Sequence, residues 1–290
     1  MNIIDIFTDP LILSMFLGAI LVGVMIAVSA SLLGVTLVLK KYSMLGDGLA
    51  HIGFGAMAVT ALVEKILDDT LARSLGSFSM LISVPIVVFA AILIMRLGEK
   101  STAGGDSAIA LVSTSALALG YIIYKYATGQ ASDVCSSMFG SAALLTPTAG
   151  DVITTLILSL AVIGLFVLFY SRIFSVTFDE SFAAATGTKT EKYKFLIAVM
   201  TAITVVMGMK MLGTVMISGL IVFPALSAMK LFKTFRSVTI ASAVISVTTT
   251  ACGILTAFLV NNMPIGPCVV MIDLAVFGAF SVIKSVKNRA

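Results

Sequence analysis

The stretch Gly46-Asp47-Gly48-Leu49-Ala50-His51 opens an apolar run that continues to Val63. A carboxylate and the only histidine of the chain therefore lie four residues apart, at the start of an expected membrane helix. This spacing places both side chains on one helical face, about one turn apart. Ionisable groups at membrane depth are costly, and they commonly face a cavity or a partner on an ion path. A carboxylate oxygen and an imidazole nitrogen together suit divalent first-row metals.

A purely structural interpretation of the same pair is equally open. Asp47 can cap the beginning of the helix, and His51 can hydrogen-bond to a neighbouring helix. The two residues alone do not decide between a metal site and this structural role.

Composition indicates a polytopic, all-α membrane protein with a single transmembrane domain over residues 1–290. Hydrophobic residues make up 59% of the chain and charged residues 11%, whereas a soluble domain averages about 25% charged residues. The net charge of +4 is spread over loop edges and forms no single patch, so nucleic acid is not expected as a partner. The three cysteines, Cys135, Cys252 and Cys268, lack CxxC spacing and are interpreted as small apolar residues.

Apolar runs predict about nine membrane-spanning helices, since each needs about 20 residues. The sixth and seventh runs are separated only by 208–213, so they form either two spans or one broken helix, and the count is eight or nine. The expected spans are 11–39, 44–63, 79–96, 108–126, 152–170, 194–208, 212–229, 235–260 and 267–284.

The basic residues predict the orientation of these spans, because cytoplasmic loops are enriched in Lys and Arg. With the N-terminus outside, fourteen of the 18 basic residues become cytoplasmic. The four on the outer side are Lys65, Arg73, Lys125 and Lys210. We therefore expect an outer N-terminus, beginning with the acidic segment 1–10, and a cytoplasmic C-terminus. The outer loops instead collect acids, which favours cations at the outer mouth.

Two further features lie at or near membrane depth. Asp273 is the other acid within an expected span, and it either lines the path or bonds to the Ser- and Thr-rich segment 242–250. We favour the structural role, because no second ligand lies nearby in sequence. The outer loop 127–150 is too polar to span and too apolar for a free linker, so we expect it to dip into the membrane or cover a channel mouth.

The segment 176–187 predicts a short exposed helix on the cytoplasmic side. Thr177 can cap it, Asp179 and Glu180 suit its first turn, and Gly187 can end it. An exposed helix between two spans invites a soluble partner, although an ordinary helical loop explains the same residues.

Six stretches in order resemble the membrane permease subunits of bacterial ABC importers for zinc, manganese or ferrous iron. The resemblance covers almost the whole chain. Each stretch alone is weak evidence, but the six stretches follow one another in the same order as the motifs of the family. They are GDGLAH at 46–51, DSAIALVSTSALALG at 106–120, SDVCSSMFG at 132–140, FDESFAAATG at 178–187, MLGTVMISGLIVFPALSA at 211–228 and NMPIGPCVV at 262–270.

This resemblance implies a metal-ligand pair and a coupling helix. The Asp and His of the family's first motif map onto Asp47 and His51 as intramembrane metal ligands. The motif of the helix that docks on the ATPase maps onto Phe178, Asp179, Glu180, Ala184 and Gly187. Ser181 and Thr186 make this segment more polar than the family pattern.

The resemblance also implies partners: cytoplasmic ATPase subunits, an extracytoplasmic metal-binding protein and a second permease chain, expected to be identical. We expect no permanently bound cofactor, because manganese or zinc is the cargo. The chain has no GxxxxGK[ST] stretch, so it cannot cradle ATP phosphates in the P-loop manner and is not expected to be an enzyme.

We therefore predict an importer permease that works by alternating access in the plasma membrane. Its rivals are an ion-coupled secondary metal carrier, which would depend on Asp47 and Asp273, and an intramembrane hydrolase, which lacks a motif such as GxSxG.

Overall fold

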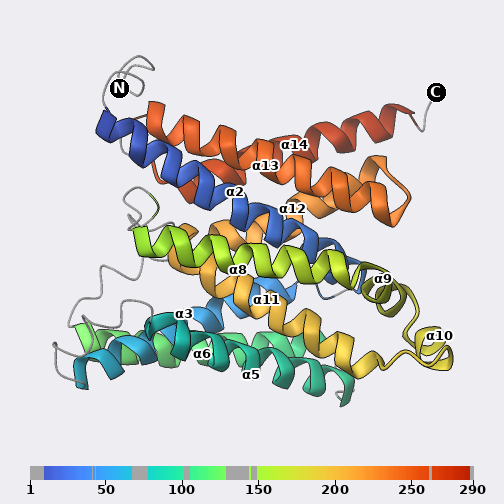
Figure 1. Cartoon of the computed structure of the whole chain (residues 1–290), viewed down its shortest axis with the longest axis horizontal. Coiled ribbons are helices and arrows are strands. Elements are labelled where there is room, and N and C mark those ends of the chain that lie inside the picture. The colour runs from blue at the N-terminus through green and yellow to red at the C-terminus, as the bar shows by residue number, and fades with distance from the viewer. Residues whose placement is uncertain are drawn as a thin grey trace.

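The computed structural model describes residues 10–40, 42, 44–66, 78–100, 105–128, 144, 149–260 and 263–287, and these residues form helices with no β-strand (Figure 1). A helix satisfies its own backbone hydrogen bonds, which a segment surrounded by lipid must do. The helices are α2 (Pro10–Leu39), α3 (Met44–Ile66), α5 (Phe78–Lys100), α6 (Gly105–Thr128), α8 (Ala149–Leu168), α9 (Tyr170–Phe178), α10 (Glu180–Ala185), α11 (Thr190–Leu212), α12 (Thr214–Leu231), α13 (Phe235–Leu259) and α14 (Ile265–Lys287).

The described residues contain eight helices that are long and apolar enough to cross a membrane. The remaining expected span, 79–96, corresponds to α5. This helix has 23 residues, but its apolar part, Ile82–Ile94, is shorter than the other eight. The prediction of an all-α protein with eight or nine spans is therefore confirmed.

The sixth and seventh expected spans are two helices that fold back on each other at Gly213. This residue has φ of 88°, in the left-handed region that favours glycine, and it ends α11 and begins α12. A Cβ atom added to Gly208 would meet the side chain of Ile217 at 2.4 Å. These residues would lie about 13 Å apart in one continuous helix, so their contact shows a hairpin.

Helix α2 lies at the centre of the bundle and packs against α8, α11, α12 and α13. Its contact with α13 is polar as well as apolar, since the hydroxyl of Ser246 donates to the Ala27 carbonyl at 3.0 Å. A second layer pairs α3 with α6, where a Cβ atom at Gly120 would meet Gly55 Cα at 2.7 Å. Small residues thus allow close helix contact, as expected for helices in lipid.

The chain begins and ends at opposite ends of the long axis of the bundle. In Figure 1, α2 starts at the left, whereas α14 ends at the right, on the side that carries α10. Three sequence predictions fall outside the described residues: those on 1–9, on Cys135 and on most of the outer loop, 129–143 and 145–148.

Candidate functional site

Asp47 and His51 lie on one face of the first two turns of α3, as their spacing predicts. His51 Nε2 is 3.6 Å from Asp47 Oδ2. The Asp47 side chain is 60% exposed and that of His51 is 26% exposed, so the pair forms part of the surface of the single chain. The buried Nδ1 of His51 has no hydrogen-bond partner among the described residues.

Glycines on the other faces of α3 fix the position of this pair. A Cβ atom at Gly46 would meet Ile221 of α12 at 3.0 Å, and one at Gly48 would meet Ile109 of α6 at 2.5 Å. Further along, Gly53 lies against Met209 of α11 and Gly55 against the Ala116 backbone of α6. Gly53 and Gly55 therefore serve close packing within the chain, and the helix is held on three sides with Asp47 left exposed.

Ser218 of α12 is a polar neighbour of Asp47 outside its own helix, and its hydroxyl donates to the Val215 carbonyl at 3.1 Å. Ser218 lies within the 211–228 stretch, where no spacing in the sequence points to a contact with Asp47. No third His, Cys, Asp or Glu joins the pair to form a metal-binding group in the described part of the chain. One chain therefore offers one carboxylate and one imidazole on an open face.

The segment between α9 and α11 forms the predicted short helix, with a different cap. Helix α10 spans six residues, and the Asp179 side chain accepts from the Phe182 amide at 2.8 Å. The prediction that Thr177 caps this helix is wrong, because Thr177 belongs to α9 and its hydroxyl donates to the Ile173 carbonyl at 2.6 Å. Gly187, with φ of 82°, follows the helix and permits the turn toward α11.

Glu180 is held by two lysines from other parts of the chain. Its carboxylate pairs with Lys194 near the start of α11 and lies 4.0 Å from Nζ of Lys40, just past the end of α2. Both lysine side chains are only 11% exposed, and Lys194 also contacts Glu191 at 3.2 Å. Glu180 is therefore a positioning residue that fastens α10 to the bundle, which the sequence did not reveal.

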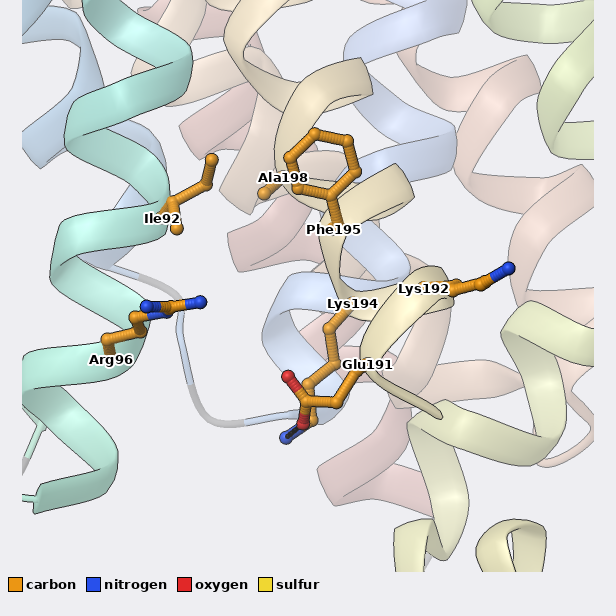
Figure 2. A pocket seen from close by; sticks show the side chains of 7 residues that line it. All are labelled: Ile92, Arg96, Glu191, Lys192, Lys194, Phe195 and Ala198. Atoms are coloured by element: carbon orange, nitrogen blue, oxygen red, sulfur yellow. Dashed lines mark hydrogen bonds and ion pairs between the residues drawn. The ribbon is translucent and has the colours of Figure 1, made fainter. Parts of the chain in front are cut away.

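A pocket of about 430 Å³ lies beside this ionic cluster, between α5 and α11. Figure 2 shows Arg96 of α5 reaching toward α11, with Ile92 above it and Phe195 on the opposite wall. Glu191 and Lys194 of α11 line the side of the pocket that faces Arg96 (Figure 2).

The surface of the segment around α10 exposes two aromatic side chains next to polar ones. Phe178 is 59% exposed and Phe182 65% exposed, and Ala184 is exposed as well, whereas Ala183 is buried. Phe178 also contacts Phe174 and Phe235, with ring centroids 4.8 and 6.1 Å away. Exposed aromatic residues at the end of α9 and on α10 form a surface suited to a protein partner.

Asp273 is buried in α14, with 1% of its surface exposed. Neither carboxylate oxygen has a hydrogen-bond partner among the described residues. Thr249, from the predicted Ser- and Thr-rich segment, is its polar neighbour, but its hydroxyl donates to the carbonyls of Ile245 and Ser246. Cys252 and Cys268 are free thiols, as their spacing predicts.

These features define a multi-pass membrane protein with an open Asp–His pair and a capped, exposed helix between two spans. The model of the ABC 3 transport family matches residues 13–284, and the chain belongs to this family. The predicted resemblance to ABC permeases is thereby confirmed, and this class of membrane component is not itself catalytic.

Named relatives agree with this assignment. The chain is 30% identical over 256 residues to a protein of Thermotoga maritima named "Probable metal transport system membrane protein", which covers 88% of this chain and 85% of that protein. It is 25% identical to the high-affinity zinc uptake system membrane protein ZnuB of Haemophilus influenzae (89% and 94% covered). It is 26% identical to the manganese transport system membrane protein MntC of Halalkalibacterium halodurans (73% and 66% covered).

A solved structure has the same fold. PsaBC from Streptococcus pneumoniae, in complex with Fab, superposes with a TM-score of 0.78 at 23% identity, and the match covers 96% of this chain and 93% of that one.

Proposed function

We propose that the chain is the permease subunit of an ATP-driven importer that moves a divalent transition metal into the cytoplasm by alternating access. The observation that carries this proposal is the Asp47–His51 pair, with 3.6 Å between Nε2 and Oδ2 on an exposed helical face. The zinc and manganese systems named among the relatives favour these two metals over iron(II).

Two copies of the chain complete the metal site in this proposal. One chain contributes two ligands, and no third is brought to them among the described residues. A homodimer would contribute two carboxylates and two imidazoles, a four-ligand O/N set acceptable to both zinc and manganese. The open position of Asp47 supports an interface there. Because each chain holds only half of the ligands, a small separation of the chains would release the metal.

Energy enters through separate ATPase subunits that dock on Phe178, Asp179, Glu180, Ala184 and Gly187. The exposed Phe178 and Ala184 would contact the ATPase, while Asp179 caps the helix and Gly187 turns the chain. The Glu180–Lys40 pair links this helix to the connection that leads into α3. Motion of the ATPases would thereby reach Asp47 and switch the site from outward to inward access.

The proposed orientation places the N-terminus outside, where an extracytoplasmic binding protein delivers the metal. The observed ion pairs support this orientation, because each of them joins residues that the sequence assigns to the same side of the membrane. Lys40, Glu180 and Lys194 meet at the predicted cytoplasmic end. Lys210 and Asp151, both assigned outside, pair at 2.9 Å.

Uptake into proteoliposomes tests this function. The chain is reconstituted with its ATPase subunits and binding protein, and manganese and zinc are supplied in competition. We expect uptake that requires ATP on the side of the membrane that carries the ATPase subunits, and that persists without an ion gradient. Uptake that needs a proton or sodium gradient but no ATP would instead establish the ion-coupled secondary carrier.

A further inference from the structure

A groove of about 630 Å³ opens between α8 and α13, beside the polar end of α9. Both helices pack on α2, whose Leu32 contributes to the groove, and they make little contact with each other. Val167 of α8 and Ile240 and Val244 of α13 line it while remaining 65%, 56% and 57% exposed. The apolar walls therefore have no partner within the described chain.

One end of this groove is polar and basic. Arg236, in the first turn of α13, lines it together with Tyr170 and Ser171 of α9. Arg236 forms no ion pair with an acidic side chain in the described part of the chain. No acidic residue lines the groove. An unbalanced cation beside two hydroxyl groups is complementary to a phosphate.

Ring contacts hold this polar end in place before any ligand binds. Tyr170 lies 5.3 Å from Phe235, the residue before Arg236, and Phe235 also lies 5.2 Å from Phe174. The start of α13 and the start of α9 are therefore fixed to each other, and the backbone that carries Arg236 and the Tyr170 ring are held in place before a ligand binds.

The dimensions of the groove match one lipid molecule in one leaflet. Arg236 and Val244 are eight residues apart on a helix, or about 12 Å, whereas half of a bilayer's hydrocarbon core is about 15 Å. A transmembrane helix of a partner would need a groove along the whole of α8 and α13, but the groove reaches only Phe166 and Val167 of α8 and residues 236–244 of α13.

We propose that this groove binds one anionic phospholipid, with its phosphate on Arg236 and Tyr170 and an acyl chain along Val167, Ile240 and Val244. Basic pockets between membrane helices bind anionic headgroups in this manner. Assignment of the lipid to the cytoplasmic leaflet rests on the orientation given under the proposed function, whereas the binding itself does not depend on metal transport.

Native mass spectrometry of the full-length purified chain tests the proposal, with phosphatidylglycerol or phosphatidylcholine added in titration. We expect one tightly retained phosphatidylglycerol and weaker retention of phosphatidylcholine. Arg236→Glu should weaken phosphatidylglycerol retention by about tenfold or more, because a charged hydrogen bond is replaced by repulsion. Lys233→Glu is the matched control, since it reverses a nearby exposed charge outside the groove, and it should retain the lipid.

A second variant keeps the test decisive if Arg236→Glu does not fold. Ile240→Trp fills the apolar half of the groove without changing charge, and it should also release the lipid. Unchanged retention in the folded variant, or equal retention of both lipids by the wild-type chain, would overturn the proposal. Unchanged lipid retention in the folded variant is also the result expected if the groove binds a partner's helix instead of a lipid.

Discussion

Nζ of Lys40 lies 4.0 Å from Oε2 of Glu180, and this pair joins the proposed coupling helix to the connection before the proposed metal ligands Asp47 and His51. Lys40 directly follows α2, and Asp47 comes seven residues later, in the first turn of α3. Lys194 pairs with the same carboxylate from α11. A shift of α10 is therefore expected to displace the end of α2 and the start of α3 together.

Charge reversal at Glu180 tests this link. Glu180→Arg should reduce metal-stimulated ATP hydrolysis by the assembled complex several-fold, because three cations would then face one another where α10 joins the bundle. Stability should fall by only about 1 kcal/mol, since the carboxylate is partly exposed. Glu191→Arg is the control: Glu191 also contacts Lys194, but it is 81% exposed. Equal ATPase stimulation in both variants and the wild type would exclude this route of coupling.

The orientation of the chain is testable with fused reporters. A reporter after Ala290 should be cytoplasmic, and one inserted in the loop 67–77 should be outside, because two expected spans precede this loop and seven separate it from the C-terminus. Finding both reporters on one side would contradict the nine-span arrangement, and an N-terminal tag on the cytoplasmic side would indicate eight spans.

The close contact of α3 with α6 predicts a specific stability effect. In Gly55→Ala, the new Cβ would lie 2.8 Å from the Ala116 carbonyl oxygen. The backbone must shift, so we expect a loss of about 1–3 kcal/mol in stability, measured as a lower thermal unfolding midpoint in detergent. Gly164→Ala is the matched control, because nothing lies within 4 Å of its added Cβ. If both variants melt with the wild type, the contact contributes little.

Much of this architecture follows from the sequence because apolar length decides where helices form in a membrane. The expected spans 44–63 and 235–260 correspond to α3 and α13 within a few residues. The break at Phe169 between α8 and α9 was not expected, since neither glycine nor proline marks it. The cap of α10 was misassigned to Thr177, because α9 continues through that residue before the chain turns at Asp179.

The candidate site was only partly accessible to sequence reasoning. The spacing of Asp47 and His51 places them on one helical face by geometry alone. The partners of Glu180 lie 140 and 14 residues away, and Ser218, a polar neighbour of Asp47, belongs to another helix. Such contacts depend on tertiary packing, which periodicity does not encode.

Acid should suppress transport through His51. The nitrogen that binds a metal must be unprotonated, and an unperturbed imidazole has a pKa of about 6.5. We expect uptake, normalised to the basal ATPase rate, to fall as pH decreases from about 7.5 to 5.5. A flat profile over this range would indicate that His51 is not a ligand.

Uptake by the Asp47→Asn complex tests the central claim most directly. Asparagine caps a helix about as well as aspartate and keeps the shape of the side chain, but its neutral amide binds divalent cations more weakly than a carboxylate. The variant should insert and assemble normally. The measurement is manganese and zinc uptake into proteoliposomes by the complete complex: a metal ligand predicts that uptake is abolished or strongly reduced, and near-normal uptake would contradict the site and leave Asp47 as a helix cap.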